Sequence, residues 1–399
     1  MRSRKQAPRR PSASKGEKRT VDAEERFRRP TSFGGGEGAP AVEWTDSDKA
    51  AAALARRIRK ADWAALDTEA DSLHSYPEKL CLVQLAAEGL VALVDPLAGA
   101  DLRPLWAALK ERTLILHGCD YDLRLLRRAE GFVPSAVFDT MLAARFLGFR
   151  RFGLESLLKE FFGVELDKKM QRADWSRRPL SARMIEYAAA DVRHLKPLAD
   201  ILSERLEAAG RAAWHREMCE RAIRRELEAE EDGRVDPWRL KGSAKLGRLG
   251  LATLRELWLW RDQEARRRNR PPFFVAQHDA LLKMAELAEK EGASAAVAAL
   301  PPKLPRRVRE GLGEAVRKAL ALPEEQWPTL RRRAAARPRP TRRAAARFEA
   351  LQARRDRVAR DLGIEASFLA PKALLLRLAA DESAADEELM DWQRKLLLD

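Results

Sequence analysis

The sequence has few cysteines, and this shortage excludes one class of fold. The chain of 399 residues carries three, at Cys81, Cys119 and Cys219. An odd and sparse set without a CxxC pair does not build a disulfide framework. We therefore expect a protein of a reducing compartment and predict a cytoplasmic location.

Long apolar runs are also missing. The sequence has no stretch of 18 or more apolar residues, so it predicts no transmembrane helix, and we expect no membrane partner. The segment MRSRKQAPRRPSASKGEKR at the start lacks an apolar signal core. We interpret residues 1–42 as a disordered basic tail in preference to an organelle transit peptide.

Two catalytic signatures are absent as well. The sequence has no GxxxxGK[ST] phosphate loop, so we expect no nucleotide cofactor and no helicase activity of its own. The five histidines are scattered and form no catalytic pair, which disfavours a metal-independent nuclease. Basic residues outnumber acidic ones by 76 to 61, and the net charge of +15 favours a polyanionic partner, nucleic acid before membrane.

The chain does contain a series of short apolar segments after residue 43. WAALDTEA, KLCLVQLAAE and LVALVDP predict three consecutive strands, with a turn at Glu88–Gly89 between the last two. TLILHGC and AVFD predict two more strands, and DLRLLRRAEG predicts a helix that Gly131 closes. Helical periodicity then continues to about residue 230. Hairpin strands followed by alternating strands and helices predict a mixed α/β sheet flanked by helices.

Beyond residue 230 the sequence predicts helices alone and contains an internal repeat. Residues 254–285 align without a gap over residues 348–379, an offset of 94 residues. Both copies predict a helix, a turn and a helix, so we interpret them as a duplicated unit in preference to chance similarity. Between the copies, residues 331–347 hold eight arginines and no acid, and their two prolines predict a loop or an interrupted helix.

Two carboxylates, Asp67 and Glu69, end the first predicted strand. Side chains two apart on a strand project to the same face, so these two acids stand together where the apolar segment stops. Like charges in a partly buried site resist ionisation, and a divalent cation is the simplest group that offsets them. Taken alone, the pair has an alternative interpretation as the start of a turn.

Further acids follow in an order that strengthens this hypothesis. HGCDYDLRLL places Asp120 and Asp122 between a strand and a helix, although an acid there also serves as a helix cap. IEYAAADVRHL places Tyr187 and Asp191 four residues apart, on one face of a helix. Asp is a poor helix former, so its place among Ala and Val predicts a specific role, the alternative being a solvated pair near Arg193.

With these motifs, residues 43–205 resemble the catalytic domain of the ribonuclease D family, within the DEDD superfamily of 3′–5′ exonucleases. LDTEADSLHSYPEKLCLVQLA is similar to its first motif, HGCDYDLRLL to its second and DKKMQRADWSRRPLSARMIEYAAADVRHLKPL to its third. The tyrosine four residues before the last Asp is typical of the tyrosine subclass. One departure is Ala173, where the family usually carries a small hydroxyl residue that contributes to a local cap.

The resemblance extends to the repeated helical units, which are similar to the helicase-and-RNase-D C-terminal (HRDC) domain. It implies a ribonuclease-H-like exonuclease domain followed by two all-α domains. The implied organisation after the tail is the exonuclease domain at 43–205, a connecting helix at 206–232, a first HRDC domain at 233–300 and a second HRDC-like domain at 301–399, which includes the Arg-rich segment 331–347.

For the site, the resemblance implies a metal-dependent 3′–5′ exoribonuclease. Two divalent cations, Mg²⁺ or Mn²⁺, would serve phosphodiester hydrolysis and release nucleoside 5′-monophosphates. Asp122 is preferred to Asp120 because it occupies the family's position, directly before the Leu that opens the helix. The implied metal ligands are Asp67, Glu69, Asp122 and Asp191, and Tyr187 would orient the attacking water. The implied substrate is structured RNA such as tRNA precursors, and we expect a monomer.

Four further side chains are expected near the substrate: Gln84, His117, Lys168 and Arg178. Arg178 is also interpreted as part of a scaffold for the third motif. Gln84 is a candidate contact for the 3′-terminal nucleotide, with a polar edge residue as the alternative. His117 has a hydrogen-bonded structural role as its alternative, because hard-ion sites prefer oxygen. Lys168 is a candidate phosphate contact, or a surface lysine. The Arg-rich segment 331–347 is a candidate for tracking phosphates, with a solvated linker as the alternative.

Two alternative functions remain from the sequence. One is a 3′–5′ DNA exonuclease in repair, because acidic motifs act on the same scissile phosphate in RNA and DNA. The other is a basic nucleic-acid-binding protein without catalysis. The complete set of four acids and Tyr187 argues against this second alternative.

Overall fold

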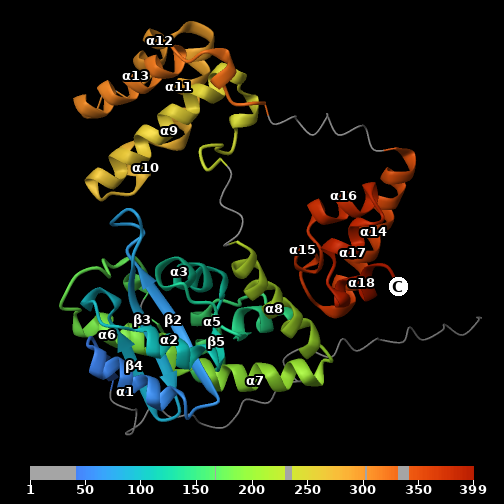
Figure 1. The fold of residues 1–399 in the computed structure, drawn as a ribbon. Coiled ribbons are helices and arrows are strands. Elements are labelled where there is room, and N and C mark those ends of the chain that lie inside the picture. The colour runs from blue at the N-terminus through green and yellow to red at the C-terminus, as the bar shows by residue number, and fades with distance from the viewer. Residues whose placement is uncertain (1–41, 167, 230–235, 302, 331–340) are drawn as a thin grey trace, which may run out of the picture. The chain divides into compact units, whose positions relative to one another are not determined.

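The structure is a computed structural model that describes residues 42–166, 168–229, 236–301, 303–330 and 341–399. The predicted basic tail therefore lies outside the described residues, apart from Val42. Within the described part, six strands between residues 42 and 139 form one sheet, and the segments after residue 236 are helical (Figure 1). Among the described helices, none has the length and apolarity needed to span a membrane.

The sheet is mixed, as predicted, with the strand order β1-β4-β3-β2-β5-β6. The strands are β1 (Val42–Thr45), β2 (Trp63–Ala70), β3 (Leu80–Ala87), β4 (Leu90–Val94), β5 (Thr113–Leu116) and β6 (Ala136–Asp139). The neighbours β2, β3 and β4 pair antiparallel, whereas β1 with β4, β2 with β5 and β5 with β6 pair in parallel. The predicted turn joins β3 to β4, where Gly89 takes a φ of +62° that suits glycine.

Helices cover both faces of the sheet (Figure 1). One face packs under α1 (Asp48–Ile58), α2 (Arg103–Lys110) and α3 (Asp120–Glu130), and the other under α6 (Ala182–Arg193) and α7 (Leu195–Ala208). On β2, Leu66 joins the core under α1 to α3, and Ala65 joins the core under α6 and α7. Because side chains alternate along a strand, Asp67 and Glu69 continue the α6 face at the end of β2.

Five further elements complete this domain. They are η1 (Pro96–Ala98), α4 (Thr140–Phe146), α5 (Leu154–Phe162), η2 (Lys168–Arg172) and α8 (Ala212–Glu228). Residues 206–232 were predicted to be a connecting helix, but α8 packs against β6, where His215 Nε2 lies 2.9 Å from the carbonyl oxygen of Asp139. α8 therefore belongs to the fold of the sheet domain, because it covers the edge strand that a free connector would leave open.

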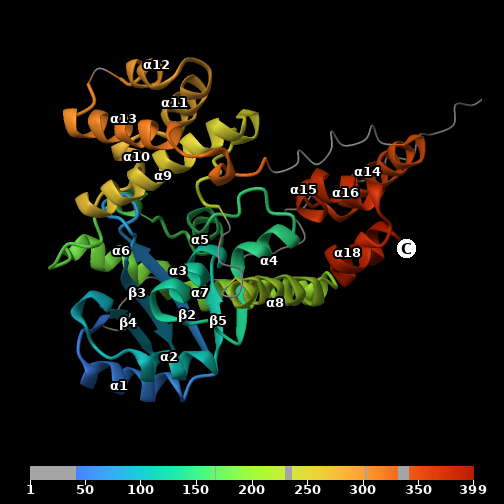
Figure 2. The same cartoon turned by 45° about the horizontal axis from the view of Figure 1, so that its top comes forward.

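The first helical module comprises the described residues between 236 and 330. Its elements are η3 (Ser243–Lys245), α9 (Arg248–Arg268), α10 (Pro272–Val275), α11 (His278–Glu291), α12 (Ala293–Ala298), α13 (Arg306–Leu320) and η4 (Glu324–Gln326). α13 lies beside α9 (Figure 2) and buries Val308 and Leu312 in one core with Leu254 and Leu281. The predicted boundary at residue 300 is therefore corrected, because the core of this module extends through α13.

The second helical module follows residue 340. It contains α14 (Arg342–Leu362), α15 (Ala366–Leu369), α16 (Lys372–Ala380), α17 (Ala384–Glu388) and α18 (Asp391–Leu397). Of the Arg-rich segment, residues 331–340 lie outside the described residues. Residues 342–347 form the start of α14, so they are helical and not part of the predicted loop. The interruption predicted before them lies outside the described residues.

The structure confirms the repeat in detail. α14 and α15 begin and end 94 residues after α9 and α10, and α16 begins 94 residues after α11. A buried contact recurs too: Arg261 Nη1 donates to the carbonyl of Ala276 at 3.2 Å, and Arg355 Nη1 donates to that of Ala370 at 3.1 Å. In both copies the same internal hydrogen bond links the long helix to the end of the short one.

Candidate active site

Three of the predicted acids converge at the end of β2. Asp67 and Glu69 project there together, and α6 brings Asp191 opposite them. Oxygen atoms of the three carboxylates lie within 4.8 Å of one another. α6 is held in place by its buried face, which includes Ala188 and Val192, and by the Ser181 side chain, which accepts a hydrogen bond from Met184 N at its start.

The electrostatics of these acids favour a cation. Burial raises the pKa of Asp67 to about 8, with the nearby Asp191 charge as a further cause. Burial, then the charges of Asp67 and Asp191, raise the pKa of Glu69 to about 10, and burial raises that of Asp191 to about 7. A cation among them restores the ionised state, and carboxylate oxygens suit hard divalent ions. These residues therefore fit the predicted divalent-cation site.

Asp122 and Asp120 have different positions at the start of α3. Asp122 is buried, whereas Asp120 is exposed. Thr68 lies between Asp67 and Glu69 on β2, and its hydroxyl donates a hydrogen bond to Asp122 Oδ1. Burial and then the charge of Asp67 raise the pKa of Asp122. This contact between β2 and α3 supports the choice of Asp122, although the group of three close carboxylates does not include it.

Tyr187 lies one turn before Asp191 on α6, so its phenol and the Asp191 carboxylate share one face of the helix. Burial, followed by the charges of Asp191 and Glu69, raises the pKa of the phenol well above its ordinary value. The hydroxyl therefore stays protonated and acts as a donor. Its ring packs near Trp175, with 6.1 Å between ring centroids, which fixes where the hydroxyl points.

A cavity of about 350 Å³ opens onto Asp67, Tyr187 and Asp191. His117 lines it, and its Nδ1 lies 2.9 Å from Thr140 Oγ1. Burial lowers the pKa of His117 to about 4, so the ring is neutral. His117 thus has the predicted structural hydrogen bond and also faces the cleft.

One exposed residue of this cavity, Gln171, was not singled out from the sequence. It lies within the third motif, in the short helix η2. Gln171 is a single glutamine in a basic stretch, and no other candidate residue stands at a spacing that would place it on the same face. The sequence therefore does not indicate a functional role for it. Lys168 begins the same helix, and its side chain lies outside the described part of the chain.

Gln84 lies on the strand predicted for it, β3, but in different surroundings from those expected. It pairs with Asp67 across the β2–β3 ladder, so the two side chains share the α6 face. β3 lies in the middle of the sheet and the Gln84 side chain is fully buried, so it is not a polar edge residue. Its amide has no hydrogen-bond partner among the described residues. Full burial argues against the predicted nucleotide contact and leaves Gln84 as a neighbour of Asp67.

Arg178 forms hydrogen bonds only to other groups of the described protein. Its Nε and Nη2 donate to the two carboxylate oxygens of Asp95, and Nη2 also donates to the carbonyl of Cys81 at 2.6 Å. Nη1 donates to the carbonyls of Trp175 and Arg177, each at 2.8 Å. All five N–H groups of the guanidinium are therefore engaged. These contacts confirm the predicted scaffold role and leave no N–H group for the predicted substrate contact. Arg178 joins β3 and the end of β4 to the segment that leads into α6.

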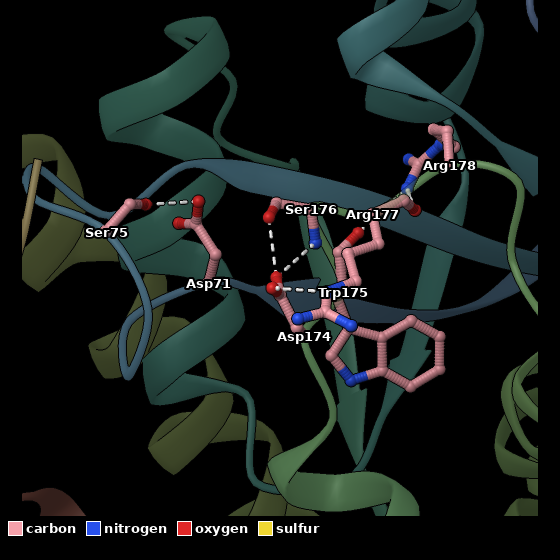
Figure 3. Close-up of polar contacts among 7 residues, drawn as sticks. All are labelled: Asp71, Ser75, Asp174, Trp175, Ser176, Arg177 and Arg178. Carbon is pink, nitrogen blue, oxygen red and sulfur yellow. Dashed lines mark hydrogen bonds and ion pairs between the residues drawn. The ribbon is translucent and has the colours of Figure 1, made fainter.

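Figure 3 shows how that segment and a neighbouring loop are closed by acids outside the cluster. Asp174 accepts hydrogen bonds from Ser176 N at 3.2 Å and from Arg177 Nε at 3.0 Å. Asp71 accepts from the Ser75 hydroxyl and from Lys79 N. Because Asp174 closes the turn, the departure at Ala173 leaves the turn intact.

Comparisons with known proteins agree with this geometry. The family profile described as 3′–5′ exonuclease matches residues 42–207, and that of the HRDC domain matches residues 250–296. Ribonuclease D of Pseudomonas paraeruginosa is 34% identical over 294 residues, which are 73% of this chain and 78% of the relative. Ribonuclease D of Granulibacter bethesdensis is 31% identical over 361 residues, 86% of this chain and 87% of the relative.

Solved structures have the same fold. The crystal structure of Escherichia coli RNase D, described as an exoribonuclease involved in structured RNA processing, is 29% identical with a TM-score of 0.72. The superposition covers 90% of this chain and 96% of that one. A crystal structure of a protein from Bifidobacterium adolescentis has a TM-score of 0.74 at 24% identity and supports the fold alone.

Proposed function

The chain belongs to the ribonuclease D family and is a 3′–5′ exoribonuclease, and from this premise we propose which residues perform the reaction. Asp67, Glu69, Asp122 and Asp191 hold two divalent cations, Mg²⁺ or Mn²⁺, and Tyr187 assists. The observation that carries the proposal is the approach of three carboxylates to within 4.8 Å at a cavity. The products are nucleoside 5′-monophosphates released from the 3′ end.

Each side chain of the site has a role that follows from its position. When bound, divalent ions stabilise the charge of the scissile phosphate and lower the pKa of water. Asp67, Glu69 and Asp191 provide the oxygen ligands, and Asp122 supports them from α3. The protonated Tyr187 hydroxyl donates a hydrogen bond and so orients water beside Asp191. The neutral His117 ring lines the cleft that receives the terminal nucleotide.

The proposed substrates are structured RNAs with 3′ extensions, tRNA precursors among them. The net charge of +15 supports a polyanion, and the Escherichia coli relative is described as acting in structured RNA processing. We propose that the chain works as a monomer in the cytoplasm. A nuclease that prefers DNA is the alternative that the assay below must separate, because the acids act on the same phosphate in both.

The two aspartates at the start of α3 give a sharp test. Purified protein is incubated with 5′-labelled RNA and a matched DNA, with Mg²⁺ or Mn²⁺ and then with a chelator. The wild type should shorten RNA from the 3′ end as a ladder, faster than DNA, and the chelator should stop it. Asp122→Asn should lose most of the rate, whereas Asp120→Asn, a change of the exposed neighbour, should keep it.

Other outcomes point elsewhere. Faster degradation of DNA would replace the proposed substrate, and binding without cleavage would remove the catalytic assignment. Equal rates for the two aspartate variants would contradict the role given to Asp122. A rate that survives the chelator would contradict the divalent cations.

A further inference from the structure

Three arginines of the first helical module gather on one buried carboxylate. Glu264 of α9 has a side chain that is 5% exposed, and it accepts hydrogen bonds from Arg267 Nε and Nη2 at 2.8 Å and from Arg268 Nε at 2.7 Å. Arg307 of α13 adds a contact of 3.4 Å from its Nε. The hydrogen bond from Arg267 is the main cause that lowers the pKa of Glu264 to about 2.

This cluster has an excess of positive charge. Three guanidinium groups surround one carboxylate, so one acid leaves two positive charges without compensation. The side chains of Arg267 and Arg307 are 52% and 65% exposed. Each guanidinium also keeps terminal N–H groups beyond those that Glu264 accepts. The buried carboxylate of Glu264 thus holds the guanidiniums in place, and their exposed side carries positive charge. Both properties suit a site that binds phosphate.

Two aromatic side chains lie exposed a few residues further along the chain, on α10. Phe273 is 40% exposed and Phe274 is 57% exposed, and their ring centroids are 4.6 Å apart. The guanidinium of Arg270 lies 5.9 Å from the centroid of Phe274. Val275 of the same short helix joins the core of the module, so α10 does not need the phenylalanines for its packing. Exposed rings beside cations are the means by which proteins bind unpaired nucleotides, through stacking and phosphate contacts.

The duplication shows that the helical fold does not require this surface. At the positions 94 residues after Glu264, Arg267, Arg268, Arg270 and Phe273, the second module has Val358, Asp361, Leu362, Ile364 and Ser367. The two helices that contain or flank these positions, α9 and α10, keep the same bounds in α14 and α15. The counterpart of Phe274 is Phe368, which is buried. The arginines and exposed rings therefore belong to the first module alone, and the shared backbone does not explain them.

We propose that the end of α9, together with α10 and the start of α13, binds an unpaired segment of the RNA substrate. Arg267, Arg268 and Arg307 contact phosphates, and Phe273 and Phe274 stack on bases. Glu264 is a positioning residue that holds the guanidiniums in place. The inference rests on the proposed function and deepens it, because it gives the first module a defined partner and leaves the second without the same surface.

The aromatic part is tested with the full chain. Binding of a fluorescent single-stranded RNA is measured by anisotropy in a chelator, which stops cleavage, and steady-state rates are measured separately with Mg²⁺. The double variant Phe273→Ser/Phe274→Ser should bind at least about 10-fold more weakly, because stacking is lost for one or two bases. Its KM should rise while kcat stays the same. Leu259→Ser, a change of another exposed apolar residue of α9, should change neither.

The charged part is tested by salt. Arg267→Ala/Arg307→Ala should reduce the slope of log Kd against log salt by about 1 to 2, because each lost phosphate contact lowers it by about 0.7 on a single strand. Lys290→Ala removes an exposed cation of α11 that is paired with Glu286, and it should leave the slope almost unchanged. Thermal unfolding shows whether each variant is folded at the temperature of the binding assay, which separates binding from folding. Arg267→Ala/Arg307→Ala should melt somewhat below the wild type, because it also removes ion pairs of Glu264.

The outcomes distinguish the two proposals. If the wild type trims RNA and the serine double variant binds and trims as well as it does, the surface assignment is wrong and the proposed function stands. If the wild type does not trim RNA, the proposed function fails whatever the variants bind. Equal loss of affinity in the Leu259 control would also overturn the assignment, because it would trace the effect to the module as a whole.

Discussion

Glu69 and Glu264 are the same type of side chain in opposite surroundings. Glu69 stands at the end of β2 with Asp67 and Asp191, and burial together with their charges raises its pKa to about 10. Glu264 stands on α9 among three arginines, and the hydrogen bonds from Arg267 and Arg268 lower its pKa to about 2. The first region gathers acids and requires a cation from solution. The second gathers cations beyond its single acid and so favours an anion from solution.

The comparison also concerns stability. Acids that repel one another in a buried cluster destabilise the fold until a cation binds, which is a common cost of an active site. A carboxylate that accepts hydrogen bonds from its own arginines contributes to stability instead. Removing one charge should therefore have opposite effects on the stability of the two regions, and the following predictions rest on that contrast.

The largest effect is expected for Asp67→Asn. The activity on RNA should fall by at least about 1,000-fold, equivalent to about 4 kcal/mol, because a central cation ligand is lost. In a chelator, the same variant should unfold at a higher temperature than the wild type, since one of the repelling charges is gone. Rates on labelled RNA and thermal unfolding by circular dichroism measure both. Asp62→Asn, an exposed acid just before β2, is the control, and a lower melting temperature for Asp67→Asn would break the comparison.

The next effect is expected for Asp95→Asn. Asp95 belongs with Glu264 in this comparison because it has its own cation, Arg178, and the side chains are 7% and 25% exposed. The variant should lose about 3 kcal/mol of unfolding free energy in urea, because the Arg178 guanidinium is left without its countercharge. Arg178→Lys should restore little of the wild-type behaviour, since an ammonium does not reproduce five directed donors.

A loss below about 1 kcal/mol would show that the Arg178 contacts are dispensable. Cation binding gives a second measurement, from the rise in melting temperature on adding Mg²⁺. Because Arg178 holds the segment that leads into α6, Asp95→Asn should weaken this rise. Arg57→Ala, which breaks an exposed ion pair with Glu43, should leave it unchanged.

A smaller change in stability is expected for Glu264→Gln. This variant should be less stable than the wild type, whereas Asp67→Asn should be more stable in a chelator. The variant should lose about 1 kcal/mol of unfolding free energy at pH 7, since its arginine partners are 25% to 65% exposed and solvent weakens the ion pairs. Urea unfolding measures it, with Glu286→Gln as the exposed control in the same module. Stabilisation by Glu264→Gln would contradict the contrast between the two regions.

The smallest effect is the change with pH in the stability difference between the wild type and Glu264→Gln. The pKa of Glu264 is lowered in the folded state from 4.5 to about 2. Its contribution to stability is therefore complete above pH 4.5 and is lost as the pH falls towards 2. The difference in unfolding free energy between wild type and Glu264→Gln should shrink over this range. A difference that stays constant down to pH 2 would mean that the ionised carboxylate does not cause it.

The sequence predicted much of the sheet and the acid cluster. Both depend on how side-chain direction repeats over a few residues of a strand or a helix. Asp67 and Glu69 share a strand face, and Tyr187 and Asp191 share a helix face, whatever the rest of the fold does. β1 was missed because four residues, two of them exposed, are too short to show alternation. The first module was predicted to end at residue 300, before α13. The repeat that defined it covers α9 to α11 and gives no information about α13.

The burial of Gln84 and the distant partners of Arg178 could not be predicted in the same way, although a scaffold role was predicted for Arg178. Gln84 was a plausible edge residue until the strand order placed β3 in the centre of the sheet. Arg178 is one basic residue in a basic stretch, and its acceptors at Cys81 and Asp95 lie 97 and 83 residues away. Spacing along the chain has no information about partners at that distance. The preference for Asp122 over Asp120 did not come from spacing either, because it rested on the family's position for this ligand.

The Arg178 contacts have a consequence for how the enzyme is made. Residues 81 and 95 leave the ribosome well before residue 178, and closing loops of this length costs more entropy than forming the β3–β4 hairpin. We expect the hairpin to form early on the nascent chain and the Arg178 contacts to form late. Until then the segment before α6 has no anchor, and Asp191 is not held opposite Asp67. We therefore expect nuclease activity to appear only after the whole catalytic domain has been synthesised.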